Sequence, residues 1–328
     1  MHQLPQHPLT RLLVCAVAAL ATVLVAGCGG SSSSATTVPS VTTTTTEVAL
    51  PGIGKPQVTI GDKNYTEQFL LGELYYEALK AQGFSVLINQ NIGPTAVTLQ
   101  ALKTGQLGMY PEYLDVWNTS VAGYHRNFTT PHKAYVAAQR YALTHGMELL
   151  DPTPFSDTSA IGVTVSYAEQ NHLRTIGDLG RVAATMTVGA PPELHNDPNG
   201  LPALEQAYGF APAAFRPLEI GQQYQALDQG TVQGAYVYTT DGELTSGNYT
   251  LLADPMHVFG IGNAVPVVSS KVLDEEGPAF EATVNRVTSL LSLTAIRAMN
   301  AAVDLAGQDP AAVARRFLED HGLIPPTG

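Results

Sequence analysis

The chain contains very little cysteine, with only Cys15 and Cys28 among its 328 residues. It also lacks the short motifs of common catalytic centres: the Gly-x-Ser-x-Gly elbow, the His-Glu-x-x-His pair and the phosphate-binding glycine loop of the Walker type. The nine histidines are scattered without the spacing of metal ligands. We therefore do not expect a fold that is stabilised by several disulfides. We also expect no enzymatic activity, and no metal or other cofactor.

Charged residues are sparse, at 13% of the chain, and 16 basic residues stand against 28 acidic ones. The formal net charge of -12 argues against nucleic acid and anionic lipid as partners, because both repel an acidic protein. The same balance is compatible with a cationic solute, although many exported proteins are acidic without such a reason.

The apolar run Leu12–Ala26 is too short for a helix that spans a bilayer. Preceded by Arg11, it is typical of the apolar region of a secretory signal peptide. It ends in Val25-Ala26-Gly27-Cys28, a pattern like the bacterial lipobox, in which the cysteine carries lipid. We expect residues 1–27 to be removed and Cys28 to anchor the protein to the outer face of the cytoplasmic membrane. The alternative is an ordinary signal peptide with Cys28 incidental.

Residues 28–56 are rich in serine and threonine, as in the runs 31–34 and 42–46, and contain too little apolar surface to pack. They predict a disordered tether in the cell envelope. Once the signal peptide is gone, Cys28 is the only cysteine left, so an internal disulfide is not possible. The folded part must then be stabilised by burial, which a chain of this length can supply.

Beyond Pro56, short β-branched runs alternate with helical patterns, which predicts an α/β fold with mixed, mainly parallel sheets. The predicted strands are 58–60, 85–88, 108–109, 148–150, 161–165, 185–189, 216–219, 234–237 and 258–262. The predicted helices are 67–82, 95–104, 132–145, 200–208 and 222–229, followed by three consecutive helices at 278–293, 294–306 and 310–321.

The length favours two domains. Two prolines in Asp151-Pro152-Thr153-Pro154 indicate an extended crossing out of a first lobe, and Asp254-Pro255 indicates the return. We therefore expect lobe 1 to consist of residues 57–152 and 255–328, and lobe 2 to consist of residues 153–254. Two crossings form a hinge, which permits closure around a ligand.

The most informative segment is Lys63-Asn64-Tyr65-Thr66-Glu67-Gln68, between a predicted strand and a predicted helix. Asn64 with Glu67 three residues later predicts a capping box at the start of this helix. A lysine and free backbone N–H groups at the carboxyl end of a strand are typical of a small-ligand site in open α/β sheets. A surface turn that binds nothing is the alternative.

Two further segments strengthen the ligand-site interpretation: Gly93-Pro94-Thr95, and Tyr110-Pro111-Glu112-Tyr113 after a short predicted strand. Taken together, the three segments resemble the substrate-binding proteins of ABC importers for glycine betaine, choline, carnitine and related osmoprotectants. The resemblance continues to the end of the chain through Pro192-Glu193, Asn199 to Pro202, Tyr224 to Leu227, Tyr238 to Asp241 and Pro266 to Val268. It implies a two-lobe periplasmic-binding-protein fold of type II, a monomer that delivers a solute to an ABC permease.

The resemblance also implies site residues. A quaternary ammonium group cannot donate hydrogen bonds, so aromatic rings hold it, while a carboxylate tail needs donors. Lys63 matches a tail-binding lysine, Tyr113 and Tyr238 match tyrosines of the aromatic cage, and Asp157 matches a polar residue beside it. Supporting contacts are expected from Thr66, Thr95 and Trp117, although a lone tryptophan is more often part of a core.

Four positions depart from the family's site. Ser159 and Gly262 stand where two more cage tyrosines are expected, Val116 stands in place of a threonine, and Asp197 stands in place of a carboxylate-binding arginine. Glycine betaine is therefore in doubt as the solute. An aspartate at 197 would suit a ligand whose second end is neutral or positive, such as choline. A sensory or scaffolding lipoprotein of the same fold is the alternative function.

Overall fold

The computed structural model describes residues 49–124, 128–197 and 199–326. The predicted signal peptide, Cys28 and most of the predicted tether lie outside the described residues. The predicted tether extends to Pro56, and within its last residues a turn at 51–54 contacts the folded part. Gly52 N donates to Gln82 O at 3.0 Å, and a Cβ at Gly52 would lie 2.2 Å from Phe84 N. Only glycine permits this close approach.

The first sheet has five strands in the order β2-β1-β3-β10-β4. β1 pairs in parallel with β2 and β3, whereas β10 pairs antiparallel with β3 and β4. The strands are β1 (Gln57–Gly61), β2 (Ser85–Asn89), β3 (Met109–Tyr113), β4 (Met147–Leu149) and β10 (Ala264–Ser269). We call this sheet and its helices lobe 1.

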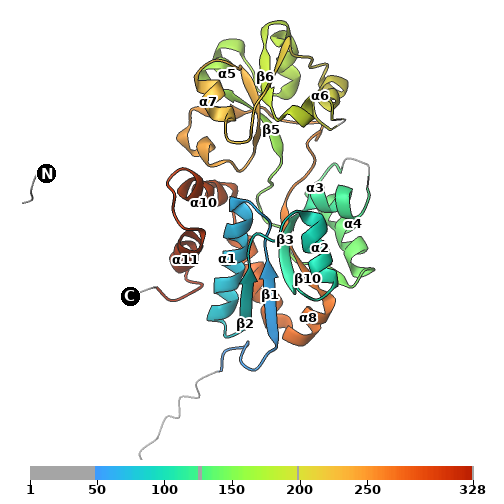
Figure 1. Cartoon of the computed structure of the whole chain (residues 1–328), viewed down its shortest axis with the longest axis vertical. Coiled ribbons are helices and arrows are strands. Elements are labelled where there is room, and N and C mark those ends of the chain that lie inside the picture. The colour runs from blue at the N-terminus through green and yellow to red at the C-terminus, as the bar shows by residue number, and fades with distance from the viewer. Residues whose placement is uncertain (1–48, 125–127, 198, 327–328) are drawn as a thin grey trace, which may run out of the picture. The chain divides into compact units, whose positions relative to one another are not determined.

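Helices cover both faces of the first sheet (Figure 1). Alternate side chains of a strand point to opposite faces, and in β10 Val268 joins one apolar core while Val267 joins the other. The last helix, α11, packs beside the first, α1, where Arg315 pairs with Glu77 at 2.7 Å. The helices are α1 (Thr66–Ala81), α2 (Thr95–Lys103), α3 (Leu114–Val116), η1 (Trp117–Val121), α4 (Pro131–Leu143), α8 (Ser270–Glu276), α9 (Pro278–Leu290), α10 (Leu293–Asp304) and α11 (Pro310–Asp320).

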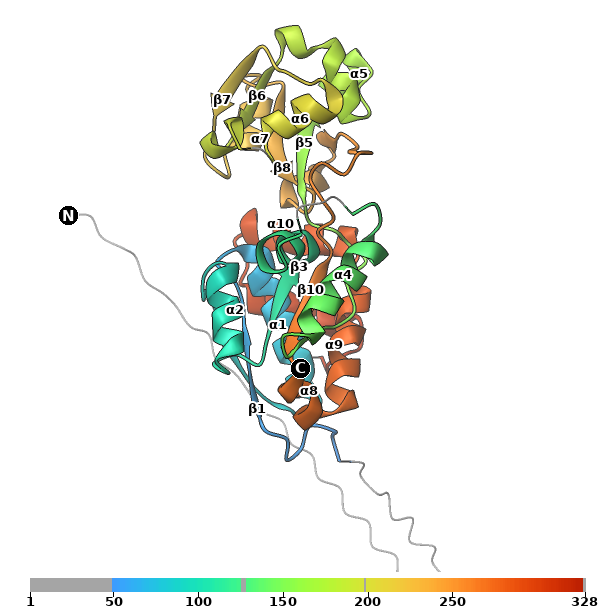
Figure 2. The same cartoon turned by 90° about the vertical axis from the view of Figure 1, so that its right-hand side faces the viewer.

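The second sheet has the order β7-β6-β8-β5-β9 and, with its helices, forms lobe 2 (Figure 2). Its strands are β5 (Ser159–Thr164), β6 (Thr187–Ala190), β7 (Ala214–Pro217), β8 (Gly234–Tyr238) and β9 (Tyr249–Leu251). Its helices are α5 (Val165–Asn171), α6 (Leu201–Tyr208) and α7 (Gln223–Asp228), with short 3-10 turns at η2 (Ile176–Arg181), η3 (Ala183–Thr185), η4 (Pro192–His195) and η5 (Gly242–Ser246).

The predicted α/β fold with two mixed sheets is confirmed, but the sheets are not mainly parallel. Each pairs two neighbours in parallel and two antiparallel. The antiparallel strands have a common cause, because β5 and β10 are the first strands after the chain passes from one sheet to the other. A strand entering from the opposite lobe runs against the strands of the sheet that it joins.

Most predicted elements are present with shifted ends, including the three C-terminal helices, which are α9, α10 and α11. The predicted strand 258–262 is absent, since the strand begins at Ala264, and β9 was missed. The Tyr110–Tyr113 segment does not follow β3 but lies within it. The strand accommodates Pro111 because this residue opposes Pro266 of β10, so that two residues without an N–H face each other.

The two connections between the sheets fall in segments 150–158 and 252–263, which contain the predicted crossings. They lie side by side: Ser156 and Asn263 form an antiparallel bridge, and Asp157 N donates to Gly262 O at 2.9 Å. A Cβ at Gly262 would lie 1.8 Å from Asp157 O, so glycine is what allows this approach. Within the described part of the chain, no helix is long and apolar enough to cross a membrane.

Candidate functional site

The turn after β1 is organised by tertiary contacts and not by the predicted capping box. Helix α1 begins at Thr66, and its N-cap residue is Tyr65, without a capping side chain. Glu67 is buried and turns away from Asn64: its Oε1 accepts from Tyr113 Oη at 2.8 Å and its Oε2 from Asn300 Nδ2 at 2.9 Å. The capping-box prediction is wrong because the Glu67 carboxylate bonds to Tyr113 of β3 and Asn300 of α10 and not to the helix terminus.

Glu112 joins the three sequence motifs at one point. Lys63 Nζ donates to Glu112 Oε1, and both side chains are buried. Thr95 Oγ1 donates to Glu112 Oε2 at 2.9 Å, and Tyr113 N donates to Oε1 at 2.9 Å. Lys63 Nζ also lies 5.5 Å from the centroid of the Tyr113 ring. The structure therefore brings Lys63, Thr95 and Tyr113 together, and Glu112 supplies a counter-charge to the lysine.

Two tyrosines of lobe 1 form a stack. The ring centroids of Tyr65 and Tyr113 are 6.3 Å apart with an interplanar angle of 25°. Tyr113 is only 3% exposed, whereas Tyr65 is 40% exposed, so the ring that faces solvent is Tyr65. Tyr65 was missed as a site residue, although its aromatic character within the motif was a usable signal. The predicted Tyr238, at the end of β8 in lobe 2, is 41% exposed.

Asp157, in the first crossing, interacts electrostatically with tyrosines of both lobes. Burial raises the pKa of Tyr65, Tyr113 and Tyr238, and the negative charge of Asp157 raises each of them further. One carboxylate thus lies within electrostatic reach of rings from both lobes. Its Oδ1 is buried and has no hydrogen-bond partner among the described residues. Burial also raises the pKa of Asp157 well above its usual range, and the Glu67 carboxylate adds to this shift.

Other carboxylates surround the same rings. Burial raises the pKa of Glu67, and hydrogen bonds from Asn300, Thr240 and Tyr113 offset part of that shift. Burial raises the pKa of Asp115 to about 6. Among the ion pairs of the described residues, only Lys63–Glu112 involves any of the four carboxylates Glu67, Glu112, Asp115 and Asp157. The surroundings of the tyrosines therefore contain more carboxyl groups than basic groups.

Helix α10 links Glu67, the partner of Tyr113, to lobe 2. Asn300 Nδ2 donates to Thr240 O at 2.9 Å as well as to Glu67. One turn earlier, Arg297 Nε donates to Thr239 O at 2.8 Å. Thr239 and Thr240 directly follow Tyr238 at the end of β8. Helix α10 thus bonds both to the site carboxylate on α1 and to the turn that carries the lobe 2 tyrosine.

Two of the predicted contacts lie elsewhere. Trp117 is fully buried against Tyr141 of α4, and its Nε1 donates to Ala138 O at 3.3 Å. It belongs to the core on the opposite face of the sheet from Tyr113. Trp117 and Tyr113 share no helical face, because Tyr113 is still part of β3. Thr66 Oγ1 donates to Asp304 at 2.6 Å, at the end of α10. Neither placement supports a contact with solute.

The four departures from the family's pattern add no ring and no positive charge. Ser159 pairs with Tyr238 across β5 and β8, and Val116 packs on the core of lobe 1. Asp197 holds a loop, its Oδ1 accepting from Asn199 N at 2.8 Å. At Gly262, any side chain would meet the backbone of Asp157. In this backbone a cage tyrosine at 262 is sterically excluded.

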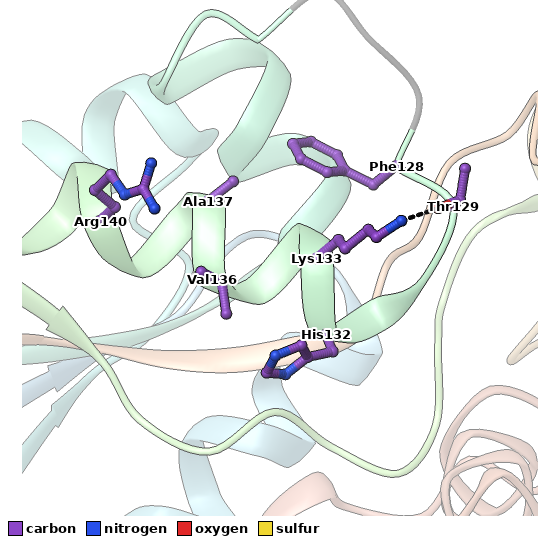
Figure 3. A pocket seen from close by; sticks show the side chains of 7 residues that line it. All are labelled: Phe128, Thr129, His132, Lys133, Val136, Ala137 and Arg140. Carbon is purple, nitrogen blue, oxygen red and sulfur yellow. Dashed lines mark hydrogen bonds between the residues drawn. The ribbon is translucent and has the colours of Figure 1, made fainter.

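A separate groove of about 450 Å³ follows the outer side of α4 (Figure 3). It is lined by apolar Phe128 and Val136 and by the basic Lys133 and Arg140, and none of the site residues described above contributes to it. Lys133 Nζ donates to Thr129 Oγ1 at 3.1 Å. Within the described residues, no group of histidine, cysteine or acidic side chains is arranged to hold a metal ion.

Comparison with known proteins identifies the family. Residues 56–320 match the model of the substrate-binding domain of the ABC-type glycine betaine transport system. The chain belongs to this family. A glycine-betaine-binding protein of Pseudomonas aeruginosa is 30% identical over 278 residues, which cover 81% of this chain and 88% of that protein. The structure of apo YehZ from Escherichia coli aligns with a TM-score of 0.71 at 28% identity, over 81% of this chain and 99% of that one.

A crystal structure of a glycine betaine/carnitine/choline ABC transporter aligns with a TM-score of 0.76 at 24% identity, over 81% of this chain and 99% of that one, and confirms the two-lobe fold. Family membership makes this chain an extracytoplasmic solute-binding protein of an ABC importer, and its family is one of transport proteins. A more distant relative, the chemotactic substrate-binding protein CosB of Halobacterium salinarum, is 24% identical over 275 residues, covering 78% of this chain and 81% of that protein.

Proposed function

We propose that this protein captures a small quaternary ammonium or osmolyte-like solute between its two lobes and passes it to an ABC permease. It does so as a monomer, without catalysis, and is held at the outer face of the cytoplasmic membrane by lipid on Cys28. The names of the relatives and of the family model point to glycine betaine and carnitine as the compounds bound by similar proteins. The choice of solute depends on the site residues of this chain.

One observation carries the proposal: Asp157, whose buried Oδ1 has no hydrogen-bond partner among the described residues, lies within electrostatic reach of Tyr65 and Tyr113 of lobe 1 and of Tyr238 of lobe 2. An alkylated ammonium group is attracted to the faces of aromatic rings and to a nearby negative charge, and it needs no hydrogen-bond acceptor. Tyr65 and Tyr238 are the two rings with exposed area to offer. Tyr113 lies behind Tyr65 and holds it in place through the stack.

The test is a thermal-shift screen of residues 49–328 against choline, glycine betaine, carnitine, ectoine, amino acids and polyamines, followed by calorimetry. A ligand that binds the native state raises the melting temperature by mass action, by an amount that grows with its concentration over Kd. At least one quaternary ammonium compound is expected to raise it. A screen in which only uncharged or anionic compounds do so contradicts the proposal.

The anchor is tested separately. With Cys28→Ser, the full chain is expected to move from the membrane fraction to the soluble fraction of the cell envelope, while solute affinity stays unchanged. A protein that remains membrane-bound after this substitution is not held by lipid on Cys28.

A sensory role is the second candidate, and the relationship to CosB favours it. The same closure around a solute would then be recognised by a signalling partner. Deletion of the gene distinguishes the two functions: loss of solute uptake supports transport, and loss of a behavioural or transcriptional response with normal uptake supports sensing.

A further inference from the structure

We infer that helix α10 is the support about which the two lobes rotate when they close, and that Arg297, Asn300 and Ala301 on this helix position lobe 2 for solute binding. The inference rests on the proposed function, because it assumes that closure of the lobes captures the solute. It goes beyond that function by naming a third connection between the lobes, besides the two crossings, and the axis of their movement.

The first contact on this axis lies between the two crossings. Asp157 N donates to Gly262 O at 2.9 Å. Next to this bond, Ser156 and Asn263 form an antiparallel bridge. A Cβ at Gly262 would lie 1.8 Å from Asp157 O, so the two backbones touch directly. No side chain at position 262 can take up a displacement of one crossing against the other.

The second contact lies between α10 of lobe 1 and the start of η5 in lobe 2. In both views of the molecule, α10 lies at the end of lobe 1 that is nearest to lobe 2 (Figures 1 and 2). Gly242 is buried there, and a Cβ at this position would lie 2.6 Å from Ala301 Cα and 2.7 Å from Ala301 N. This contact, too, joins two backbones at a glycine.

Two hydrogen bonds hold the same helix to the turn that follows Tyr238. Arg297 Nε donates to Thr239 O at 2.8 Å, and Asn300 Nδ2 donates to Thr240 O at 2.9 Å. Both acceptors are backbone oxygens. Helix α10 therefore fixes the backbone that carries the lobe 2 tyrosine, and not only a side chain of that lobe.

Thr239 connects the α10 contact to the first crossing. Its Oγ1 donates to Ser156 O at 2.8 Å and accepts from Thr158 N at 3.0 Å. Its backbone N donates to Thr158 O at 2.9 Å. Since its carbonyl oxygen accepts from Arg297, this one residue is bonded both to the hinge and to α10. The two glycine contacts thus belong to one continuous set of bonds.

The geometry of rotation gives these contacts their meaning. In a rotation, the displacement of an atom grows with its distance from the axis. A contact between two backbones persists only where that displacement is small, because no flexible side chain lies between them. An axis through the contacts at Gly262 and Gly242 preserves both of them, while the edges of the two sheets approach each other as in hinge closure.

Spin labels test the axis, because both cysteines of the chain precede residues 49–328 and introduced cysteines are then the only ones. Thr245→Cys with Leu305→Cys places labels on exposed residues on either side of the α10 contact. Asn89→Cys with Glu219→Cys places them on exposed residues at the ends of the edge strands β2 and β7. With the solute that gives the largest thermal shift, we expect the second interspin distance to change and the first to remain constant.

A change in both distances overturns the inference, because the α10 contact is then broken on closure. No change in either distance while the solute binds also overturns it and leaves solute binding in place. If no compound of the thermal-shift screen binds, the proposed function fails and the inference fails with it.

Arg297→Met tests the positioning role, since methionine packs in a similar way but donates no hydrogen bond. We expect the dissociation rate of the solute to rise about tenfold and the Asn89–Glu219 distance in the complex to become more widely distributed. Arg297→Lys, which keeps the charge and a donor, should restore most of the wild-type rate. The control is Arg316→Met at an exposed position on α11, which should change neither quantity. A less stable Arg297→Met protein with wild-type dissociation and distances would show that Arg297 is only structural.

Discussion

Tyr113 Oη donates to Glu67 Oε1 at 2.8 Å, and this bond joins the end of β3 to the first turn of α1. The other oxygen of Glu67 accepts from Asn300 on α10, which also bonds to Thr240 O in lobe 2. A single carboxylate therefore couples the buried tyrosine of the site to helix α10 and, through it, to the second lobe.

This coupling predicts the effect of Asn300→Leu. Leucine has a similar size but donates no hydrogen bond, so Glu67 Oε2 and Thr240 O each lose a buried partner. We expect the free energy of unfolding to fall by about 1–3 kcal/mol, measured by urea denaturation. Solute affinity should fall as well, because the turn that carries Tyr238 is no longer tied to α10.

The control is Asn285→Leu on α9, whose Oδ1 accepts from Asp151 N at an exposed position. It should change stability less and leave affinity unaltered. Loss of stability without any change in affinity for Asn300→Leu would show that α10 is only structural.

Tyr65→Leu is predicted to weaken binding of a quaternary ammonium solute at least tenfold, or about 1.4 kcal/mol, because leucine keeps the apolar contact but has no ring to attract a cation. Tyr65→Phe should retain most of the affinity. The measurement is calorimetry with the ligand that gives the largest thermal shift.

Tyr76→Leu is the matched control, since Tyr76 lies in helix α1, of which Tyr65 is the N-cap residue, and Lys80 Nζ lies 5.0 Å from the centroid of its ring. Equal loss of affinity in the two leucine variants would mean that the effect comes from helix α1 as a whole and not from the ring at position 65.

Solute affinity is expected to rise with pH between about 5 and 8. In the free protein, burial raises the pKa of Glu67 and Asp157, and it raises the pKa of Asp115 to about 6. A bound cation favours the ionised carboxylates and lowers these pKa values, so the complex holds fewer protons than the free protein. Binding therefore releases protons, and higher pH favours it.

Calorimetry in two buffers of different ionisation enthalpy measures the proton release directly. Proton uptake on binding, or an affinity that falls as the pH rises, would contradict the assignment of a cationic ligand to these carboxylates.

Asp62 predicts a pH dependence of stability. Its Oδ1 accepts from Asn91 N at 2.6 Å, and burial raises its pKa to about 7, with a further contribution from Glu73. Because the folded state holds a proton that the unfolded state releases above about pH 4, the free energy of unfolding falls as the pH rises through 7. Asp62→Asn should remove this penalty and be about 1–3 kcal/mol more stable than wild type at pH 8.

The advantage of Asp62→Asn should shrink as the pH is lowered to 5, where wild-type Asp62 is protonated. Denaturant midpoints at pH 5 and 8 measure it, with Asp274→Asn at an exposed position as the control. A constant difference across this range would show that the side chain does not titrate there.

Gly262→Ala is predicted to lower the free energy of unfolding by about 1–3 kcal/mol or more, because its Cβ would lie 1.8 Å from Asp157 O and force the two crossings apart. Gly180→Ala, with no atom within 4 Å of the added Cβ, should change stability by no more than about 0.5 kcal/mol. A stable Gly262→Ala would show that the crossings can separate at little cost.

Several features could be predicted from the sequence because their causes are local. The alternation of β-branched runs with helical patterns predicted the α/β class, and amphipathic spacing predicted α9, α10 and α11. Prolines marked the segments in which both crossings fall. The motifs from Lys63, Thr95 and Tyr113 predicted one ligand site, and these three side chains do meet. Residue order and spacing carry this information because strand ends in an open sheet converge at one edge.

Other features were decided only by tertiary structure. Glu67 has the spacing of a capping residue, yet Tyr113 and Asn300, which are distant in sequence, take its carboxylate. Trp117 has the spacing of a site residue, yet it packs in the opposite core. The position of Lys63 in its motif predicts a cation that is free to bind a ligand, yet Glu112 neutralises its charge. In each case a partner more than 20 residues away along the chain decided the role, and the strength of such contacts depends on burial, which the order of residues alone does not determine.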